Sequence, residues 1–365
     1  MTVEEKKVEL IELFYDLIFV YAISNLTALI SKPVNGIIPF NNLFAYFITS
    51  FVILQAWLYF TNYVNRYGKW ELHEYILAIV NMIAVIFMAN TISTQWSEMF
   101  VPFNVSMLVM LLTVVTLYSI RAYQEKSLKG AAGNSISILL IVCFVYLIAI
   151  IAIFLNFNNV IITLIDAVAV ITGAFLPFFL KGEFDKSIIN FPHLVERFEL
   201  LTIITFGEAV VGMTHFFDVY NLSLLPILVF IIIITMFGSY VIQIHNLVNH
   251  HRVERSLRLM FSHYFIIISI NLMTVAIELL HNSEVSVLLE SMLMIVSLVV
   301  FYTSLLANKK YYHDDVELNK NDIIKIILLI VIGSLVMFAF NILIGALIIT
   351  VGCFIVLAKK DKLRA

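Results

Sequence analysis

The residues best suited to do chemistry are three acids in the first long apolar stretch of the chain, VELIELFYDLIFVYAISNLT. Glu9, Glu12 and Asp16 are spaced three and four residues apart, so a helix would place them on one face. A charged side chain at the centre of a bilayer costs on the order of 3 kcal/mol on insertion scales, so such a residue usually has a function or a partner. Buried carboxylates of this kind can bind and release a proton or a cation.

A second polar line lies in the middle of the chain, in the segment ERFELLTIITFGEAVV. Glu196 and Arg197 begin this segment, and Glu208 lies deeper in it, near the face that carries Arg197. Arg197 could pair with Asp16 or Glu12 if the starts of the two helices face each other. The alternative is that Glu9, Glu12, Glu196 and Arg197 are interfacial residues, because acids stabilise helix N-termini and long side chains reach water.

Other polar residues within apolar segments are secondary candidates for a site: His73, Asn81, Asp166, His263 and Asn271. For the two histidines, a structural role and a proton relay both remain open. The sequence contains no HExxH zinc helix, no Gly-x-Ser-x-Gly elbow and no DDxxD-like cluster. It therefore predicts no metal site and no cofactor. Aromatic residues near the ends of apolar segments are typical of interfacial belts, and we assign Tyr15, Trp57, Tyr59, Tyr63 and Trp70 to such belts.

The composition of the chain indicates which elements must position these residues. Apolar residues make up 62% of the sequence and charged residues 13%, whereas soluble domains are about half apolar. The chain is therefore predicted to be an all-α integral membrane protein. With a net charge of -3, the chain has no overall positive electrostatic field that would attract nucleic acid, so nucleic-acid binding is excluded. Cys143 and Cys353 lie alone in apolar runs and suit buried thiols.

A helix needs about 20 residues to cross the hydrocarbon core of a bilayer. On that basis the sequence predicts twelve transmembrane helices, at 9–30, 42–62, 73–94, 104–122, 135–155, 159–180, 194–215, 222–246, 260–280, 286–306, 323–340 and 342–358. The last two could instead be one long tilted helix, and we predict a tight hairpin that turns near Phe340 and Asn341.

The distribution of basic residues supports the hairpin. With twelve spans, every Lys and Arg except Lys32 falls on one side of the membrane, whereas eleven spans would move the C-terminal basic cluster to the other side. Because the cytoplasmic side is the basic one, both termini are predicted to be cytoplasmic. No loop is long enough for a soluble domain, so the function is expected in or beside the membrane.

An internal repeat is visible when the chain is shifted by 184 positions, which aligns Glu12 with Glu196. After a six-residue insertion, His73 aligns with His263 and Asn81 with Asn271. Polar residues are scarce in these segments, so such matches are informative. We therefore predict two six-helix repeats, 1–186 and 187–365, within a single membrane domain. Because six is even, the repeats would be parallel and related by an axis along the membrane normal.

The segments ELFYDLIFVYAISNL and ERFELLTIITFGEAVV resemble the bacterial low temperature requirement A (LtrA) family, and the resemblance extends over essentially the whole chain. It implies a multi-pass protein of the bacterial cytoplasmic membrane. The family name records a growth phenotype in the cold and implies no settled biochemical activity.

Two classes of function follow from these observations, with a third left open. The first is a transporter or channel whose buried carboxylates couple to a proton or cation. The second is a membrane-embedded enzyme acting on a lipid or isoprenoid substrate, and the third is a non-transporting sensor subunit. Buried acids and duplicated topology favour the first, by analogy of fold. The expected partners are membrane lipid and an unknown ion or small molecule.

Overall fold

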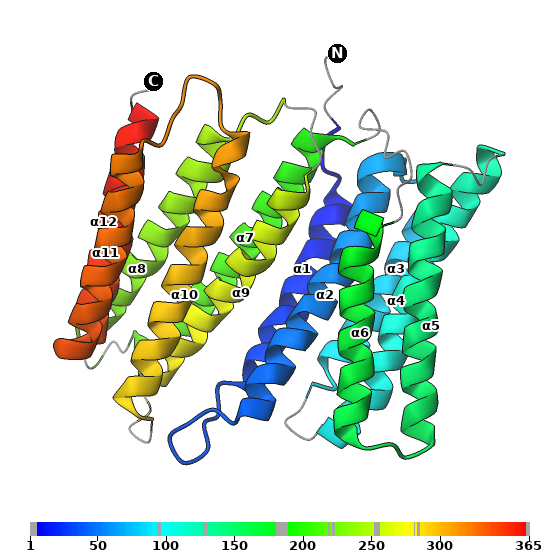
Figure 1. The fold of residues 1–365 in the computed structure, drawn as a ribbon, viewed down its shortest axis with the longest axis horizontal. Coiled ribbons are helices and arrows are strands. Elements are labelled where there is room, and N and C mark those ends of the chain that lie inside the picture. The colour runs from blue at the N-terminus through cyan, green and yellow to red at the C-terminus, as the bar shows by residue number, and fades with distance from the viewer. Residues whose placement is uncertain are drawn as a thin grey trace. The chain divides into compact units, whose positions relative to one another are not determined.

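The structure, a computed structural model, is built from long α-helices. It describes residues 6–92, 96–126, 130–179, 189–217, 220, 223–251, 256–280, 282 and 285–362. The described residues form isolated β-bridges, between Val34 and Ile37 and between Val248 and Tyr312, and no β-sheet. Figure 1 shows the order of the helices along the chain.

The helices of the first half are α1 (Leu10–Leu26), α2 (Phe40–Tyr67), α3 (Leu72–Ala89), α4 (Trp96–Gln124), α5 (Ala131–Phe154) and α6 (Asn159–Phe179). Those of the second half are α7 (Phe191–Met213), α8 (Leu225–Tyr240), α9 (Leu257–Leu279), α10 (Val287–Ala307), α11 (Lys320–Ala339) and α12 (Ile342–Lys362). α8 continues into a π-helix, η4 (Val241–Leu247). The short 3-10 helices are η1 (Thr27–Leu29), η3 (Thr214–Phe216) and η5 (Asn308–Tyr311).

Eleven of these helices are long and apolar enough to cross a membrane. The remaining long helix, α7, has 23 residues and carries four charged side chains, Glu196, Arg197, Glu199 and Glu208. Helices are expected throughout, because lipid offers no partner for backbone N–H and C=O groups. The predicted fold class, an all-α multi-pass membrane protein, is confirmed.

The predicted turn between the last two helices is also confirmed. α11 ends at Ala339 and α12 begins at Ile342, so Phe340 and Asn341 connect them. The Asn341 side-chain oxygen accepts hydrogen bonds from the backbone N–H groups of Leu343 and Ile344, at 2.9 and 3.2 Å. This contact satisfies donors at the start of α12 that have no partner within the helix.

The chain divides into two compact units. The first consists of Met1–Leu29 and Phe40–Leu194, and the second of Ile30–Pro39 and Val195–Ala365. The division falls within the first turns of α7. The first unit therefore contains α1 to α6 with the start of α7, and the second contains the rest of α7 with α8 to α12.

Several helix pairs that pack together in the first unit have counterparts, six helices further along the chain, that pack together in the second. In the first, α3 packs on α4, α5 on α6, and α6 also contacts α2 and α4. In the second, α9 packs on α10, α11 on α12, and α12 also contacts α8 and α10. Shared pairing is expected of a duplicated fold but does not establish a superposition, so the repeat stays a prediction.

The distribution of side chains on α6 is typical of a helix that faces lipid on one side. Its large apolar residues Leu164, Val168 and Ile171 are exposed, whereas Asp166 is buried. A lipid-facing surface requires this arrangement, because polar groups must find partners inside the protein.

Candidate functional site

The site begins where the chain enters α1. Glu9 is the N-cap residue and Glu12 the third residue of the helix, and together they form a capping box. The backbone N–H of Glu9 donates to Oε1 of Glu12 at 3.4 Å. The side chain of Glu9 is exposed, so capping accounts for it without a further role.

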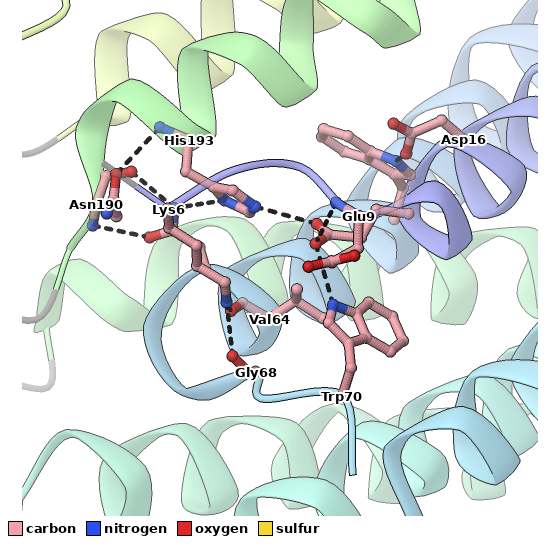
Figure 2. Close-up of polar contacts among 11 residues, drawn as sticks. Lys6, Glu9, Asp16, Val64, Gly68, Trp70, Asn190 and His193 are labelled. Carbon is pink, nitrogen blue, oxygen red and sulfur yellow. Dashed lines mark hydrogen bonds and ion pairs between the residues drawn. The ribbon is translucent and has the colours of Figure 1, made fainter. Parts of the chain in front are cut away.

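Glu12 has more partners than a capping residue needs. Its side chain is fully buried, and its Oε1 also accepts a hydrogen bond from the indole Nε1 of Trp70 at 3.1 Å. Its Oε2 lies 3.2 Å from Nε2 of His193, although the two are not aligned for a straight hydrogen bond. Figure 2 labels Trp70 and His193 and marks these two contacts with dashed lines. The carboxylate of Glu12 thus joins α1 to the α2–α3 loop and to the first turn of α7.

His193 is held by two asparagines. The side-chain oxygen of Asn65 accepts the backbone N–H of Asn190 at 3.2 Å, which turns its amide nitrogen toward Nδ1 of His193, 3.1 Å away. The backbone N–H of His193 donates to the side chain of Asn190 at 3.1 Å. Because the Asn65 nitrogen is a donor, Nδ1 is the accepting nitrogen of the ring. In the neutral ring this tautomer carries its proton on Nε2, the atom that faces Glu12.

Trp70 reaches Glu12 from a constrained loop. Its backbone has a φ of 57°, in the left-handed region that non-glycine residues rarely adopt. The loop is fixed by the buried carboxylate of Glu74, which accepts the backbone N–H groups of Lys69 and Glu71 at 3.0 and 2.8 Å. Tyr63 donates to the same carboxylate at 3.0 Å. An unfavourable backbone conformation that is held in place is often part of a functional site.

Lys6 ties the segment before α1 to the end of α2. Its ammonium group donates to the backbone oxygens of Val64 and Gly68, the second at 2.8 Å (Figure 2). Carbonyl groups at a helix C-terminus lack partners within the helix and attract cations. This contact fixes the chain just before the acids of α1.

Asp16 lies one helical turn beyond Glu12 and is also fully buried. Its Oδ1 accepts a hydrogen bond from the indole Nε1 of Trp57, on α2, at 2.7 Å. The neighbouring Tyr15 donates to Asn81 on α3 at 2.9 Å. Asn81 in turn donates to the backbone oxygen of Met110 and to Thr113 on α4, at 3.1 and 2.8 Å. Asn81 therefore has a structural role that links three helices.

The arrangement presents two buried carboxylates on one face of α1, each of which accepts an indole N–H. A neutral donor stabilises an ionised carboxylate without adding a positive charge. These two donors therefore add no positive charge that would repel an approaching cation.

The sequence model of the family described as bacterial low temperature requirement A protein (LtrA) matches residues 7–358. The chain belongs to this family. The match covers nearly the whole sequence and includes Glu12, Asp16 and every partner described above except Lys6. No curated protein matches the chain as a relative.

In this LtrA chain the predicted site residues of α7 belong to the second unit. Arg197 is fully buried, Glu208 is partly exposed and Glu196 is exposed. The predicted pairing of Arg197 with Asp16 or Glu12 would join residues of different units, and it stays a prediction.

The two histidines aligned by the proposed repeat have different surroundings. The side chain of His73 is 30% exposed and lies 3.6 Å from Glu71. His263 is fully buried, lies 3.1 Å from the Tyr240 hydroxyl and 2.8 Å from the backbone oxygen of Leu259, and packs on the ring of Phe198. His263 therefore has the contacts of a core residue.

Two secondary candidates keep polar atoms that have no hydrogen-bond partner among the described residues. Asn271 is buried, and its side-chain nitrogen has none. Asp166 is 4% exposed, and its Oδ1 has none. Across the part of the chain that the structure describes, no three His, Cys, Asp or Glu side chains are grouped so that they could hold a metal ion.

The assignment of aromatic residues to interfacial belts is wrong for Tyr15, Trp57 and Tyr63. All three are buried inside the protein and donate hydrogen bonds, to Asn81, Asp16 and Glu74 respectively. Burial with a hydrogen-bond partner is the other common environment of Tyr and Trp, and composition alone does not separate the two.

Sequence reasoning missed His193 as a site residue and gave Trp70 only a belt role. His193 precedes the segment that contains Glu196, and no spacing relates it to Glu12. A usable signal was present in Trp70, which follows Gly68 in the short loop between two predicted helices. A large aromatic residue held in such a tight connection is a candidate for contact with the helix ends around it.

Proposed function

We propose that this LtrA-family chain is a transporter or channel of the bacterial cytoplasmic membrane, with both termini cytoplasmic. In this proposal, Glu12 and Asp16 bind the proton or cation that is moved or that drives movement. The substrate is an ion or small molecule of unassigned identity.

The burial of Asp16 carries this proposal. Glu12 is the third residue of α1, where capping and the helix dipole favour an acid in any case. Asp16 lies in the second turn, beyond the first turn in which the dipole acts, so neither effect requires a carboxylate there. An acid retained at such a position despite its desolvation is expected to have a function.

The surroundings of the two carboxylates support coupling rather than a purely structural role. Glu12 lies beside the ring of His193, whose Nε2 is 3.2 Å away, so a proton can pass between the two groups after a small rotation. Asp16 lies one turn deeper on the same helix. The pair provides two successive acceptors along α1, as a relay into the membrane requires.

The test is to reconstitute the purified protein in liposomes and to measure proton and cation flux, with lipid scrambling recorded in parallel. Asp16→Asn keeps the size of the side chain and removes its charge. We expect this variant to express and melt close to the wild-type temperature but to lose flux. We also expect wild-type flux to vary with pH, because a carboxylate that cycles between protonated and ionised forms depends on proton concentration.

The matched control is Glu9→Gln, which changes an exposed acid that only caps the same helix. This variant should retain flux. If Asp16→Asn and Glu12→Gln both retain full, pH-dependent flux, the acids are structural and the proposed coupling is wrong. Scrambling without ion flux would favour a lipid-handling protein instead.

A further inference from the structure

The side-chain amide of Asn65 occupies one side of the His193 ring. Asn65 is buried near the end of α2, and its nitrogen donates to the backbone oxygen of Asn190 at 2.7 Å. Its oxygen accepts the backbone N–H of the same residue at 3.2 Å. These two bonds fix which end of the amide faces which group. The second hydrogen on the nitrogen therefore points to Nδ1 of His193, 3.1 Å away.

The amide cannot be turned over without loss. A turned amide would place its oxygen against the backbone oxygen of Asn190 and its nitrogen against the backbone N–H, so two hydrogen bonds would be lost. An N–H group cannot accept a hydrogen bond from a protonated Nδ1. As long as Asn65 stays paired with Asn190, His193 is therefore held neutral, with its proton on Nε2.

The other ring nitrogen of His193 faces an acceptor without completing a bond to it. Nε2 lies 3.2 Å from Oε2 of Glu12, both side chains are fully buried, and Nε2 has no aligned hydrogen bond among the described residues. Oε1 of Glu12 already accepts the indole N–H of Trp70 and the backbone N–H of Glu9. Oε2 is therefore the oxygen that a proton from His193 would reach.

The permanent charges near His193 favour the neutral ring. The ammonium group of Lys6 donates to backbone oxygens at the end of α2 (Figure 2). Arg197 follows His193 by one turn on α7. Two cations therefore oppose a second proton on the ring, whereas the carboxylate of Glu12 favours it. Water screens the two exposed acids of α1 and α7, Glu9 and Glu196.

We propose that Asn65 gates a proton relay from His193 to Glu12. A proton from the cytoplasmic side binds Nδ1 once the Asn65 amide has moved away. The Nε2–H bond then breaks as an O–H bond forms at Oε2 of Glu12, which leaves a neutral ring with its proton on Nδ1 and a neutral carboxylic acid. The N–H donors on Oε1 favour the ionised carboxylate, so Glu12 can pass the proton on.

This gate rests on the transport function proposed above and assigns the coupling ion as a proton. It also makes Asn65 a positioning residue, because its amide acts through His193 and does not itself carry the proton. Asn65 can return to the ring only after Nδ1 has lost its proton, since two N–H groups cannot bond each other. The pairing of α2 with the start of α7 therefore changes with each proton that passes.

The first test reads the protonation of His193 directly, without transport. Nuclear magnetic resonance of the purified full chain with isotope-labelled histidine separates the two neutral tautomers from the doubly protonated ring, and His193→Gln identifies the signal. We expect the neutral Nε2–H form at neutral pH. Glu12→Gln should keep this tautomer, because Asn65 rather than Glu12 selects it.

Asn65→Asp replaces the donor at Nδ1 with an acceptor of the same size. We expect His193 to become doubly protonated at neutral pH in this variant. Asn62→Asp is the matched control, since it adds the same charge one turn earlier in α2, at a partly exposed residue, and should leave His193 neutral. If Asn65→Asp does not fold, Asn65→Ala decides, because removal of the donor should let His193 take up its second proton at a higher pH than in the wild type.

The second test measures proton flux into liposomes that contain the wild type or Asn65→Asp, driven by a membrane potential. Wild-type flux should vary with pH where His193 takes up its second proton, and Asn65→Asp should lose that dependence because its Nδ1 is already protonated.

The outcomes separate the gate from the transport function. A doubly protonated or Nδ1–H ring in the wild type, or a His193 titration that Asn65→Asp and Asn65→Ala leave unchanged, would overturn the gate. Metal-cation flux without proton flux, or an unchanged pH profile in Asn65→Asp, would overturn it and leave the transport function standing. Absence of any flux in the wild type would overturn the transport function, and the relay with it, even with the expected spectra.

Discussion

The indole of Trp57 holds the carboxylate of Asp16 across two helices at 2.7 Å. We expect Trp57→Phe to lower the free energy of unfolding by about 1–3 kcal/mol, because a fully buried carboxylate loses a donor while most of the ring volume remains. Denaturation of the purified protein in detergent measures the change.

A double-mutant cycle tests whether the hydrogen bond between Trp57 and Asp16 is responsible for this loss of stability. The effect of Trp57→Phe should shrink by at least about 0.5 kcal/mol when Asp16 is already Asn, since contacting residues are coupled. An equal effect in both backgrounds would assign the loss to ring packing instead.

At the level of residues, the sequence predicts the acids of the site but not their donors. Glu12 and Asp16 are conspicuous because a charge in an apolar helix needs an explanation. Their partners are not conspicuous, because aromatic residues near the ends of apolar segments occur in interfacial belts and in protein cores alike. These partners are Trp57, Trp70 and His193. Which of them meets an acid depends on how α2 and the α2–α3 loop pack against α1, and no local pattern encodes that packing.

The contact between α11 and α12 depends on glycine. A Cβ atom on Gly345 would lie 2.4 Å from the backbone oxygen of Gly333, so Gly345→Ala must move the helices apart. We expect this variant to lose about 1–3 kcal/mol of stability, as overpacked interiors do. Thermal melting measures the loss.

Gly207→Ala is the control for that variant. No described atom lies within 4 Å of the added methyl group, so we expect a change near zero or a gain of up to about 1 kcal/mol from helix propensity. If Gly345→Ala is no more destabilised than Gly207→Ala, the glycine contact does not hold the hairpin.

The start of α3 fixes the loop that carries Trp70. Glu74→Ala removes the acceptor of two backbone N–H groups and of the Tyr63 hydroxyl. We expect faster hydrogen exchange at Lys69 and Glu71 and a loss of about 1–2 kcal/mol, typical of a lost helix cap. Glu98→Ala, in the first turn of α4, is an exposed control that should leave exchange in this loop unchanged.

At the level of helices, the sequence predicts nearly all of the fold. Span lengths are set by bilayer thickness, and the predicted ends lie within about five residues of the observed ones when η4 is counted with α8. The exception is α4, which begins at Trp96, eight residues before its predicted start. The π-helix Val241–Leu247 was not predicted, because an inserted turn changes neither length nor apolarity. It contains His245, which lies 3.2 Å from Glu199 of α7.

For the whole molecule, the twelve-helix topology predicts where reporters will appear. Fusions after Lys69, Lys129, Lys186, Arg258, Lys320 and Arg364 should all report a cytoplasmic position, because the basic loops remain on that side. Reporter activity at these sites in intact cells measures their location. An external C-terminus would contradict the topology.

The repeat hypothesis also belongs to the whole molecule. The shared pairing of helices in the two units predicts that 9–180 and 194–358 superpose by rotation about the membrane normal. An experimental structure in lipid would show this directly. Superposition by inversion alone, or no superposition, would exclude a parallel duplication.

The short connection between α11 and α12 bears on how the protein is made. With just Phe340 and Asn341 between them, and with backbones that touch at Gly333 and Gly345, neither helix can reach its final position alone. We therefore expect the insertion machinery to release α11 and α12 (Figure 1) into lipid together, as one hairpin. A nascent chain that stalls after the first helix of this hairpin would leave the face of α11 around Gly333 without the helix that packs on it.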